Sequence, residues 1–343
     1  MKVLGIETSC DETAIAIIGD DKKVYAHTLL SQIDDHKSYG GVVPELASRS
    51  HLSHISNVYH RTLLEAGLSL DDVDAIAVTA GPGLIGGLLV GVMFAKGLAL
   101  AGNKPFLAIN HLEGHALTIR LSHEVTFPYL MLLVSGGHCQ ILEVLGVGNY
   151  QMIGKTRDDS VGEAFDKVAK MLGLPYPGGP VIEALAENGN PDSIKFPRAL
   201  LKDTPCDFSF SGLKTAVKRQ IESCQLNEQK IADICASFQK TVSVILGDRL
   251  INAAKKFHQS HPHSNTIVIA GGVAANQYIK SYIQNLLPGY NIITPPIKLC
   301  TDNGIMIAWA GIERLQNGLV DTLDFEPRSR WPLDQLSNQQ IKV

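Results

Sequence analysis

Two histidines stand four positions apart in the stretch INHLEGHALTIRL, residues 109–121. His111 and His115 would lie on one face of a helix, an arrangement that can hold a divalent metal ion. Glu113 would point to roughly the opposite side, because each helical residue turns the chain by about 100°. In the zinc-protease motif H-E-x-x-H the glutamate stands three residues before the second histidine and serves as the base. The spacing here therefore argues against a metalloprotease.

A histidine pair alone is often incidental, so a third candidate ligand is needed. Asp302 lies in CTDNG, residues 300–304, a polar loop between a predicted strand and a predicted helix. It could instead cap that helix, although Asn303 could also do so. Two histidines and one aspartate with open coordination positions suit Zn²⁺ or Fe²⁺. The residue types alone allow Asp302 to be either a metal ligand or a helix cap.

Small-residue turns follow several predicted strands. LVSGGH, residues 133–138, has two glycines whose backbone N–H groups could approach a phosphate or carboxylate, although a tight hairpin explains the same pattern. AGGVAAN, residues 270–276, suits either ligand binding at a helix N-terminus or close strand–helix packing. ETSCDET, residues 7–13, offers hydroxyls and carboxylates suited to a phosphate or its cation, or to an ordinary surface turn. AGPGLIGG, residues 80–87, is explained as well by helix packing.

The composition predicts an ordered protein without a globally basic surface. The chain of 343 residues has 30 Lys+Arg against 34 Asp+Glu, so RNA binding would require a local basic patch. The six cysteines form no C-x-x-C pair, and no signal peptide is visible, which favours a cytoplasmic protein. The most apolar window, residues 84–102, is interrupted by Lys96 and rich in glycine, which favours a buried helix over a membrane span.

The predicted elements recur in the two halves of the chain. Strands are expected at residues 2–7, 13–18 and 24–30, and again at 129–134, 139–145 and 150–154. Chance similarity within one large α/β domain is the alternative, but the recurrence favours a duplicated α/β fold with ligands at the carboxyl ends of strands. The first lobe is expected at residues 1–110, joined by a C-terminal helix at 303–325. The second is expected at 111–302, with a helical insertion at about 155–228.

A set of motifs spread in order along residues 2–333 resembles the TsaD family of tRNA threonylcarbamoyltransferases. The motifs are GIETSCDET, YGGVVPELASRSH, GPGLIGGLLVG, NHLEGH, LVSGGH, GEAFDKVAK, YPGG, FSFSGLKTA, GGVAAN, CTDNG and RWPL. The resemblance implies a two-lobed α/β fold of the actin/sugar-kinase/Hsp70-like (RNase H-like) type, with a ligand cleft between the lobes. It also implies transfer of a threonylcarbamoyl group from threonylcarbamoyl-AMP to N6 of the adenosine next to the anticodon, with release of AMP. The tRNAs concerned read codons that begin with A.

The resemblance also implies roles for individual residues. The implied metal ligands are His111, His115 and Asp302, holding one divalent ion per subunit, Fe²⁺ or alternatively Zn²⁺. The implied contacts to an adenine nucleotide or threonylcarbamoyl-AMP are Leu133, Val134, Ser135, Gly136, Gly137, Asp166, Gly179, Glu183 and Asn276. Glu183 stands where many members have Asp, and Cys139 stands where Thr is common. By their location in the first turn, Asp11 and Glu12 are the candidate catalytic bases.

The implied partners are tRNA, a TsaB-like paralogue, a TsaE-like ATPase and a separate synthase that supplies threonylcarbamoyl-AMP; no membrane is involved. The helix after AGPGLIGG is the expected paralogue interface. Candidate tRNA contacts are Lys195, Arg198, Lys214, Lys218 and Arg219, although an ordinary solvated face explains each of them equally well; the next candidates are Arg328 and Arg330. A small-molecule kinase of the same fold would explain the turns but not the histidine pair. A non-catalytic scaffold would leave the metal ligands without a purpose.

Overall fold

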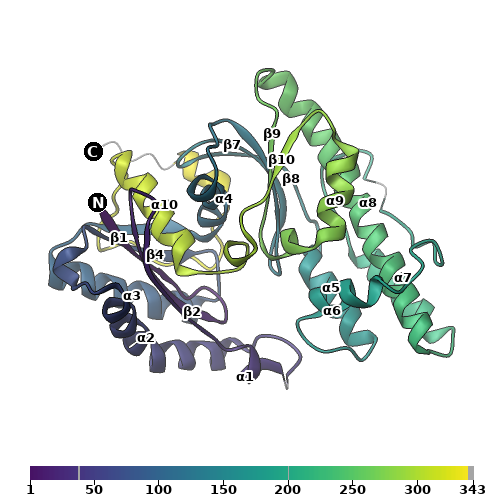
Figure 1. The fold of residues 1–343 in the computed structure, drawn as a ribbon, viewed down its shortest axis with the longest axis horizontal. Coiled ribbons are helices and arrows are strands. Elements are labelled where there is room, and N and C mark those ends of the chain that lie inside the picture. The colour runs from purple at the N-terminus through teal and green to yellow at the C-terminus, as the bar shows by residue number, and fades with distance from the viewer. Residues whose placement is uncertain (38, 200, 339–343) are drawn as a thin grey trace. The chain divides into compact units, whose positions relative to one another are not determined.

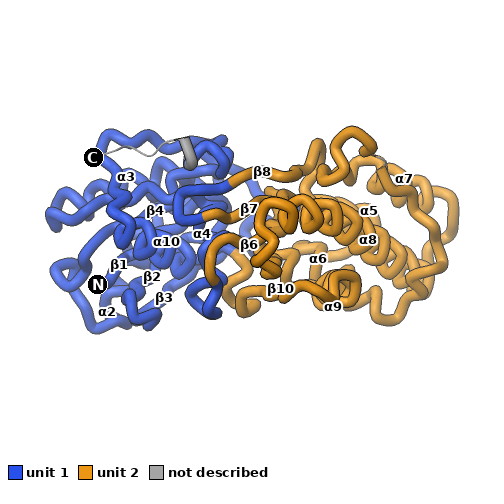
Figure 2. The backbone as a smooth tube through the Cα atoms, turned by 90° about the horizontal axis from the view of Figure 1, so that it is seen from above, with its two compact units in different colours: residues 1–125, 146–150, 302–343 blue, residues 126–145, 151–301 orange. Residues whose placement is uncertain are grey.

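The computed structural model describes residues 1–37, 39–199 and 201–338 (Figure 1). Backbone packing divides the chain into two compact units (Figure 2). Unit 1 contains Met1–Val125, Gly146–Tyr150 and the chain from Asp302 onward, and unit 2 contains Thr126–Leu145 and Gln151–Thr301. The segment 111–125, which follows the expected end of the first lobe at residue 110, lies in unit 1.

Unit 1 is built on a five-stranded sheet with the order β3-β2-β1-β4-β5. Its strands are β1 Lys2–Glu7, β2 Glu12–Gly19, β3 Val24–Ser31, β4 Ala75–Gly81 and β5 Phe106–Asn110. Its helices are α1 Ile33–Lys37, α2 Pro44–Ala66, α3 Ile85–Gly102, α4 His111–Ser122 and α10 Gly304–Gln316, with short 3₁₀ helices at Leu70–Asp72 and Leu333–Asn338. Strand β1 is antiparallel to β2 and parallel to β4, and β4 is parallel to β5. Helices α2 and α3 pack on one side of the sheet, and α10 lies on the other with α4 beside it (Figure 1).

Unit 2 repeats this arrangement with the order β10-β9-β6-β7-β8. Its strands are β6 Tyr129–Val134, β7 Cys139–Gly146, β8 Asn149–Lys155, β9 Thr266–Ala270 and β10 Asn291–Ile293. Its helices are α5 Val161–Met171, α6 Gly178–Ala186, α7 Ser211–Glu222, α8 Glu228–Ser260 and α9 Gln277–Leu286, with 3₁₀ helices at Gly272–Ala275 and Ile297–Leu299. As in unit 1, the first strand is antiparallel to the second and parallel to the fourth, so the predicted duplication is confirmed.

Two glycines allow helix α10 to approach the sheet of unit 1 at backbone distance. A Cβ atom on Gly5 would lie 2.3 Å from the Ala308 nitrogen, and one on Gly304 would lie 2.7 Å from the Ala16 nitrogen. This packing holds the N-terminal end of α10, which follows Asp302, against β1 and β2. The helix ends at Gln316 rather than at the predicted residue 325, because Gly318 adopts a φ of 71° that ends helical geometry.

Helix α3 has one buried and one exposed apolar face. Among the described residues it is the one helix that is long and apolar enough to cross a membrane by length and composition. It packs against α2, β4 and β5 through small and branched side chains, as helices in the core of a folded unit do. Its opposite face exposes Ile85, Leu89, Met93 and Leu100. The prediction of a buried helix is therefore correct for only one of its faces.

Candidate metal centre and substrate-binding turns

Both histidines lie in the first two turns of helix α4, which begins directly after strand β5. Asn110 caps the helix, because its Oδ1 accepts a hydrogen bond of 2.9 Å from the Leu112 nitrogen. The Asn110 side chain also donates to the Trp331 carbonyl at 2.9 Å, which ties the start of the helix to the C-terminal segment. His111 and His115 are 6% and 2% exposed. The helix start that carries the histidines is thus held on both sides.

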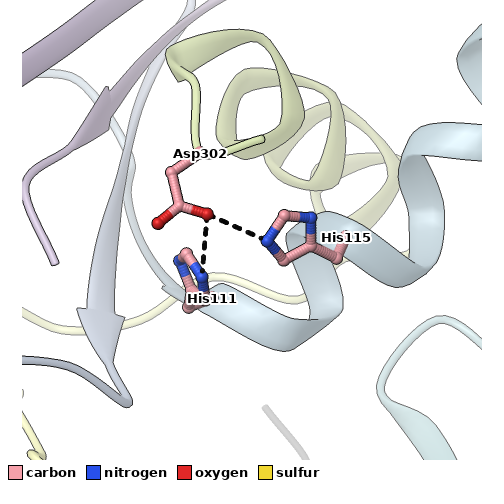
Figure 3. A group of neighbouring side chains, drawn as sticks. All are labelled: His111, His115 and Asp302. Carbon is pink, nitrogen blue, oxygen red and sulfur yellow. Dashed lines mark hydrogen bonds and ion pairs between the residues drawn. The ribbon is translucent and has the colours of Figure 1, made fainter. Parts of the chain in front are cut away.

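Asp302 faces both imidazoles (Figure 3). Its Oδ1 lies 3.1 Å from His115 Nε2 and 3.4 Å from His111 Nε2. Metal bonds of about 2.1 Å separate neighbouring ligand atoms by roughly 3.0–3.4 Å, so these spacings fit a shared ion. In the part of the chain that the structure describes, no other group of three His, Cys, Asp or Glu residues is so close together. Asn303 rather than Asp302 caps helix α10, accepting from the Met306 nitrogen at 2.9 Å. The carboxylate of Asp302 is therefore available as a ligand.

The charges around the histidines favour a cation at this point. Burial opposes ionisation of Asp302, but the neighbouring His111 and His115 outweigh it and hold the pKa of Asp302 well below its usual value. Burial also opposes a charge on His111, yet the carboxylates of Asp302 and Glu7 raise the pKa of His111 well above its usual value. In the metal-free protein these carboxylates thus favour a proton on the imidazole. A divalent ion would displace that proton on binding.

Asp11 lies in the turn before β2 and Glu12 begins that strand, in the same unit as the candidate metal ligands. Asp11 is buried and Glu12 is partly exposed. Burial and the negative charges of Asp302 and Asp11 raise the pKa of Glu12 to about 9. Burial contributes most to this shift, and the charges of Asp302 and Asp11 add to it because both carboxylates lie within electrostatic range of Glu12.

Glu113 points away from the metal ligands, as predicted from its helical position. Its Oε1 accepts hydrogen bonds from the Gly148 nitrogen at 2.9 Å and from the Tyr150 hydroxyl at 3.0 Å. Its Oε2 accepts from Arg314 Nη1 at 3.1 Å. Because both oxygens are occupied on the opposite side of α4, Glu113 is not placed to act as a metalloprotease base.

Gly87, the last residue of AGPGLIGG, and Gly91, one turn further along α3, pack against the turn after β1. A Cβ atom on Gly87 would lie 2.3 Å from the Thr8 carbonyl oxygen, and one on Gly91 would lie 2.2 Å from Thr8 Oγ1. The Thr8 hydroxyl donates to the Gly87 carbonyl at 2.9 Å. These glycines therefore let helix α3 support the turn that leads to Asp11.

The loop Leu133–Gly137 is a tight turn between β6 and β7. The Ser135 nitrogen donates to the His138 carbonyl at 2.8 Å, and the His138 nitrogen donates to Ser135 Oγ at 3.0 Å. Added Cβ atoms on Gly136 and Gly137 would meet nothing within 4 Å, so the side of each glycine from which a side chain would project is open. The other side of Gly136 packs against α5, where a Cβ atom on Gly162 would lie 2.9 Å from the Gly136 nitrogen. The hairpin interpretation is correct.

The other predicted substrate contacts join helices of unit 2. Asp166 Oδ1 accepts from the Gly178 nitrogen at 2.7 Å, and Glu183 Oε1 accepts from the Gln277 nitrogen at 2.7 Å. Asn276 caps α9 and donates to Gln239 Oε1 at 2.8 Å. Gly179 has open space in front of its Cα. In GGVAAN, a Cβ atom on Gly271 would lie 2.4 Å from the Val134 carbonyl, so this glycine serves close packing.

The carboxylate of Glu7 lies beside the histidines but was not among the site residues expected from the sequence. Glu7 ends strand β1, is 1% exposed, and has its Oε2 3.1 Å from His111 Nδ1. The sequence signal was a glutamate at the end of an otherwise apolar strand. Its partner could not be read from the sequence, because the two residues are 104 positions apart.

Two duplicated α/β units, one with a cluster suited to a metal ion, define a protein of the actin/sugar-kinase/Hsp70-like class. Similar solved structures are component A of (R)-2-hydroxyglutaryl-CoA dehydratase from Acidaminococcus fermentans and a ROK hexokinase from Thermus thermophilus. The first has a TM-score of 0.53 at 18% identity, covering 90% of this chain and 96% of that chain. The second has a TM-score of 0.51 at 15% identity, covering 93% and 100%. At such identities the likeness shows the fold alone.

The chain belongs to the TsaD family, described as tRNA N6-adenosine threonylcarbamoyltransferase, whose family model matches residues 23–309. It is 54% identical over 343 residues to the tRNA N6-adenosine threonylcarbamoyltransferase of Rhodospirillum rubrum, covering 97% of this chain and 95% of the relative. It is equally identical over 332 residues to that of Wolbachia pipientis wMel, covering 97% and 98%. The predicted family and enzyme class are confirmed, and the protein is a transferase that modifies tRNA.

Proposed function

We propose that this protein transfers the threonylcarbamoyl group from threonylcarbamoyl-AMP to N6 of the adenosine next to the anticodon. The acceptors are tRNAs that read codons beginning with A. N6 attacks the carbamoyl carbonyl carbon, the bond from that carbon to the phosphate oxygen breaks, AMP leaves, and N6 gives up a proton. The observation that carries this proposal is the His-His-Asp cluster, in a chain similar over almost its full length to enzymes of that name.

One divalent ion, Fe²⁺ or alternatively Zn²⁺, is held by His111, His115 and Asp302 in this proposal. Bound there, the ion supplies Lewis-acid polarisation of the carbonyl and orients the substrate. The adenine amine is a poor nucleophile because its lone pair is delocalised into the ring, so alignment and carbonyl activation must lower most of the barrier. Asp11 and Glu12 are the proposed acceptors of the proton that N6 loses. With a pKa of about 9, Glu12 carries a proton at neutral pH and would have to give it up before accepting another.

The adenine nucleotide, or threonylcarbamoyl-AMP itself, is proposed to bind to unit 2. Its proposed contacts are Leu133, Val134, Ser135, Gly136, Gly137, Asp166, Gly179, Glu183 and Asn276. The open space in front of Gly136, Gly137 and Gly179 supports this assignment, because a phosphate could reach their backbone N–H groups. We propose that units 1 and 2 correspond to the two lobes of the fold.

The protein is proposed to work in the cytoplasm with a TsaB-like paralogue, a TsaE-like ATPase and a separate synthase that supplies threonylcarbamoyl-AMP. The exposed apolar face of α3, formed by Ile85, Leu89, Met93 and Leu100, supports a protein partner on this helix. Leu89→Glu would place a charge in the centre of such an interface. Size-exclusion chromatography with the purified paralogue should then show loss of the complex, whereas Leu226→Glu in unit 2 should leave it intact. Equal binding by both variants would remove α3 from the interface.

The decisive assay combines purified protein, threonylcarbamoyl-AMP, tRNA and the partners, and measures modified adenosine and released AMP. His111→Ala and His115→Ala should remove both the bound metal and the transfer, while circular dichroism shows an intact fold. His60→Ala, an exposed position on α2, is the matched control. Full metal occupancy in the double variant of His111 and His115 would overturn the metal assignment. Formation of modified adenosine without AMP release would overturn the proposed donor.

A further inference from the structure

The carboxylate of Glu7 is surrounded by hydrogen-bond donors at the carboxyl ends of three neighbouring strands. Its Oε1 accepts from the Ser9 nitrogen at 2.6 Å, and its Oε2 accepts from the Thr79 hydroxyl. The same Oε2 lies 3.1 Å from Nδ1 of His111. Glu7 ends β1, Thr79 lies in β4, and His111 follows β5, so three parallel strands bring these groups together.

This arrangement determines which nitrogen of the His111 ring keeps its proton when an ion binds. An ionised carboxylate only accepts hydrogen bonds, so a hydrogen bond to Glu7 requires a proton on Nδ1. In the metal-free protein Asp302, 3.4 Å from Nε2, favours a proton on that nitrogen in the same way. A divalent ion would replace the Nε2 proton and leave the proton on Nδ1 that Glu7 holds. Ser9 Oγ, 3.2 Å from the same Nδ1, can either donate or accept and so does not select a tautomer.

We propose that Glu7 is a positioning residue of the metal centre, which holds His111 in the Nδ1–H tautomer and directs Nε2 toward the ion. The inference rests on the proposed metal binding by His111, His115 and Asp302. Glu7 itself does not touch the ion in this arrangement, because its oxygens contact the far side of the ring. Carboxylates that accept from the second nitrogen of a ligating histidine fix its orientation and make it a better ligand.

Glu7→Gln tests the proposal with almost no change in volume. If the glutamine oxygen faces the Ser9 N–H, its amide group must donate to His111 Nδ1 and drive the ring proton to Nε2. If the oxygen faces His111 instead, the amide group opposes the Ser9 N–H. The first arrangement puts a proton on the ligating Nε2, and the second keeps Nε2 free only by setting an amide group against the Ser9 N–H. Either way the ligating state becomes less favourable, so we expect Co²⁺ affinity, measured with a competing chelator, to fall by about 10–100-fold.

Thr79→Val is the matched control, because it removes a hydrogen bond to the same carboxylate and leaves the contact between Glu7 and His111 in place. Its Co²⁺ affinity should change far less than that of Glu7→Gln. Equal losses in the two variants would assign the effect to general disturbance of the strand ends and overturn the inference. Unchanged affinity in Glu7→Gln would overturn it while leaving the metal site standing. Absence of Co²⁺ binding by the wild-type protein would instead refute the metal site itself.

A second measurement needs only the wild-type protein and so does not depend on the variant folding. In the Zn²⁺ form with ¹⁵N-labelled histidine, the His111 ring should show a proton on Nδ1 and none on Nε2. Chemical shifts that place the metal on Nδ1 would overturn the inference.

Discussion

Neutralising Glu113 should destabilise unit 1, although Glu113 lies on the side of α4 away from the metal ligands. The carboxylate is fully buried, and its hydrogen bond with Arg314 joins α4 to α10. It also accepts from the Gly148 nitrogen. Gly148 belongs to the short segment 146–150, which connects β7 to β8 in the sequence and is part of unit 1. Glu113→Gln keeps the volume but removes the charge and directs an amide group or a neutral oxygen at Arg314.

The expected magnitude follows from what remains around Arg314. Arg314 is 8% exposed. Burial lowers the pKa of Arg314, but the charges of Glu113 and Asp321 outweigh burial and raise it, so Arg314 stays charged. After the substitution the nearest carboxylate is Asp321, at 3.7 Å. Removing one partner of a buried ion pair costs about 3–5 kcal/mol, because the other charge stays buried. With Asp321 still in place, we expect a loss near the lower limit, about 3 kcal/mol.

Urea unfolding followed by tryptophan fluorescence measures this loss selectively. Both tryptophans of the chain, Trp309 and Trp331, lie in unit 1, so their emission reports the unfolding of that unit. The control is Glu65→Gln, which breaks the exposed ion pair with Arg61 on α2 and should cost less than about 1 kcal/mol. Equal costs for the buried and the exposed glutamate would refute the reasoning.

A double-mutant cycle separates the ion pair from the other hydrogen bonds of Glu113. Arg314→Met alone leaves Glu113 buried without its cation and should also be strongly destabilising. The double variant should lose less free energy of unfolding than the sum of the two single variants, because no uncompensated charge remains at the pair. Strict additivity would mean that the two side chains do not interact.

Three further predictions concern other parts of the molecule. Burial lowers the pKa of His51 in the folded protein below its ordinary value of 6.5, so protonation favours the unfolded chain. The free energy of unfolding should therefore fall as the pH drops below 6.5, and His51→Gln should flatten this fall in urea titrations. Gly304→Ala would place a methyl group 2.7 Å from the Ala16 nitrogen and should cost about 1–3 kcal/mol in the same assay. Lys214 is largely buried and paired with Asp159, whereas Lys218 is exposed. Charge reversal at Lys218 should therefore lower the salt slope of tRNA binding by about one unit. Charge reversal at Lys214 should instead lower the free energy of unfolding. Filter binding across a salt series measures the first outcome, and urea unfolding measures the second.

Local periodicity made the histidine pair and Glu113 predictable from the sequence. Residues four apart on a helix share a face, and a residue between them does not, so the structure agrees with the expected directions of these side chains. The strands were predictable for a similar reason, since each is a short apolar run between polar or glycine turns. The end of α10 was placed too late, because the effect of Gly318 depends on its backbone conformation.

The contact between Glu7 and His111 could not be predicted in this way, because it depends on which strands are neighbours. The parallel pairing of β1 with β4 and of β4 with β5 aligns their carboxyl ends, and no local pattern specifies that order. Likewise, the sequence of α3 is apolar on both faces, so it could not indicate which face packs on the sheet and which stays exposed.

The metal cluster is built by the packing of unit 1 alone. His111 and His115 come from a helix whose start is capped by Asn110, and Asp302 precedes a helix that Gly304 holds against the sheet. The two histidines lie in a helix, and Asp302 lies in the short loop directly before a helix that packs on the sheet. Such fixed positions would reduce the entropy lost if an ion binds to these proposed ligands. The proposed nucleotide contacts all come from unit 2. If both proposals hold, the proposed metal ligands and the proposed nucleotide contacts depend on separate sets of packing contacts, so a substitution in one unit should leave binding at the other unchanged.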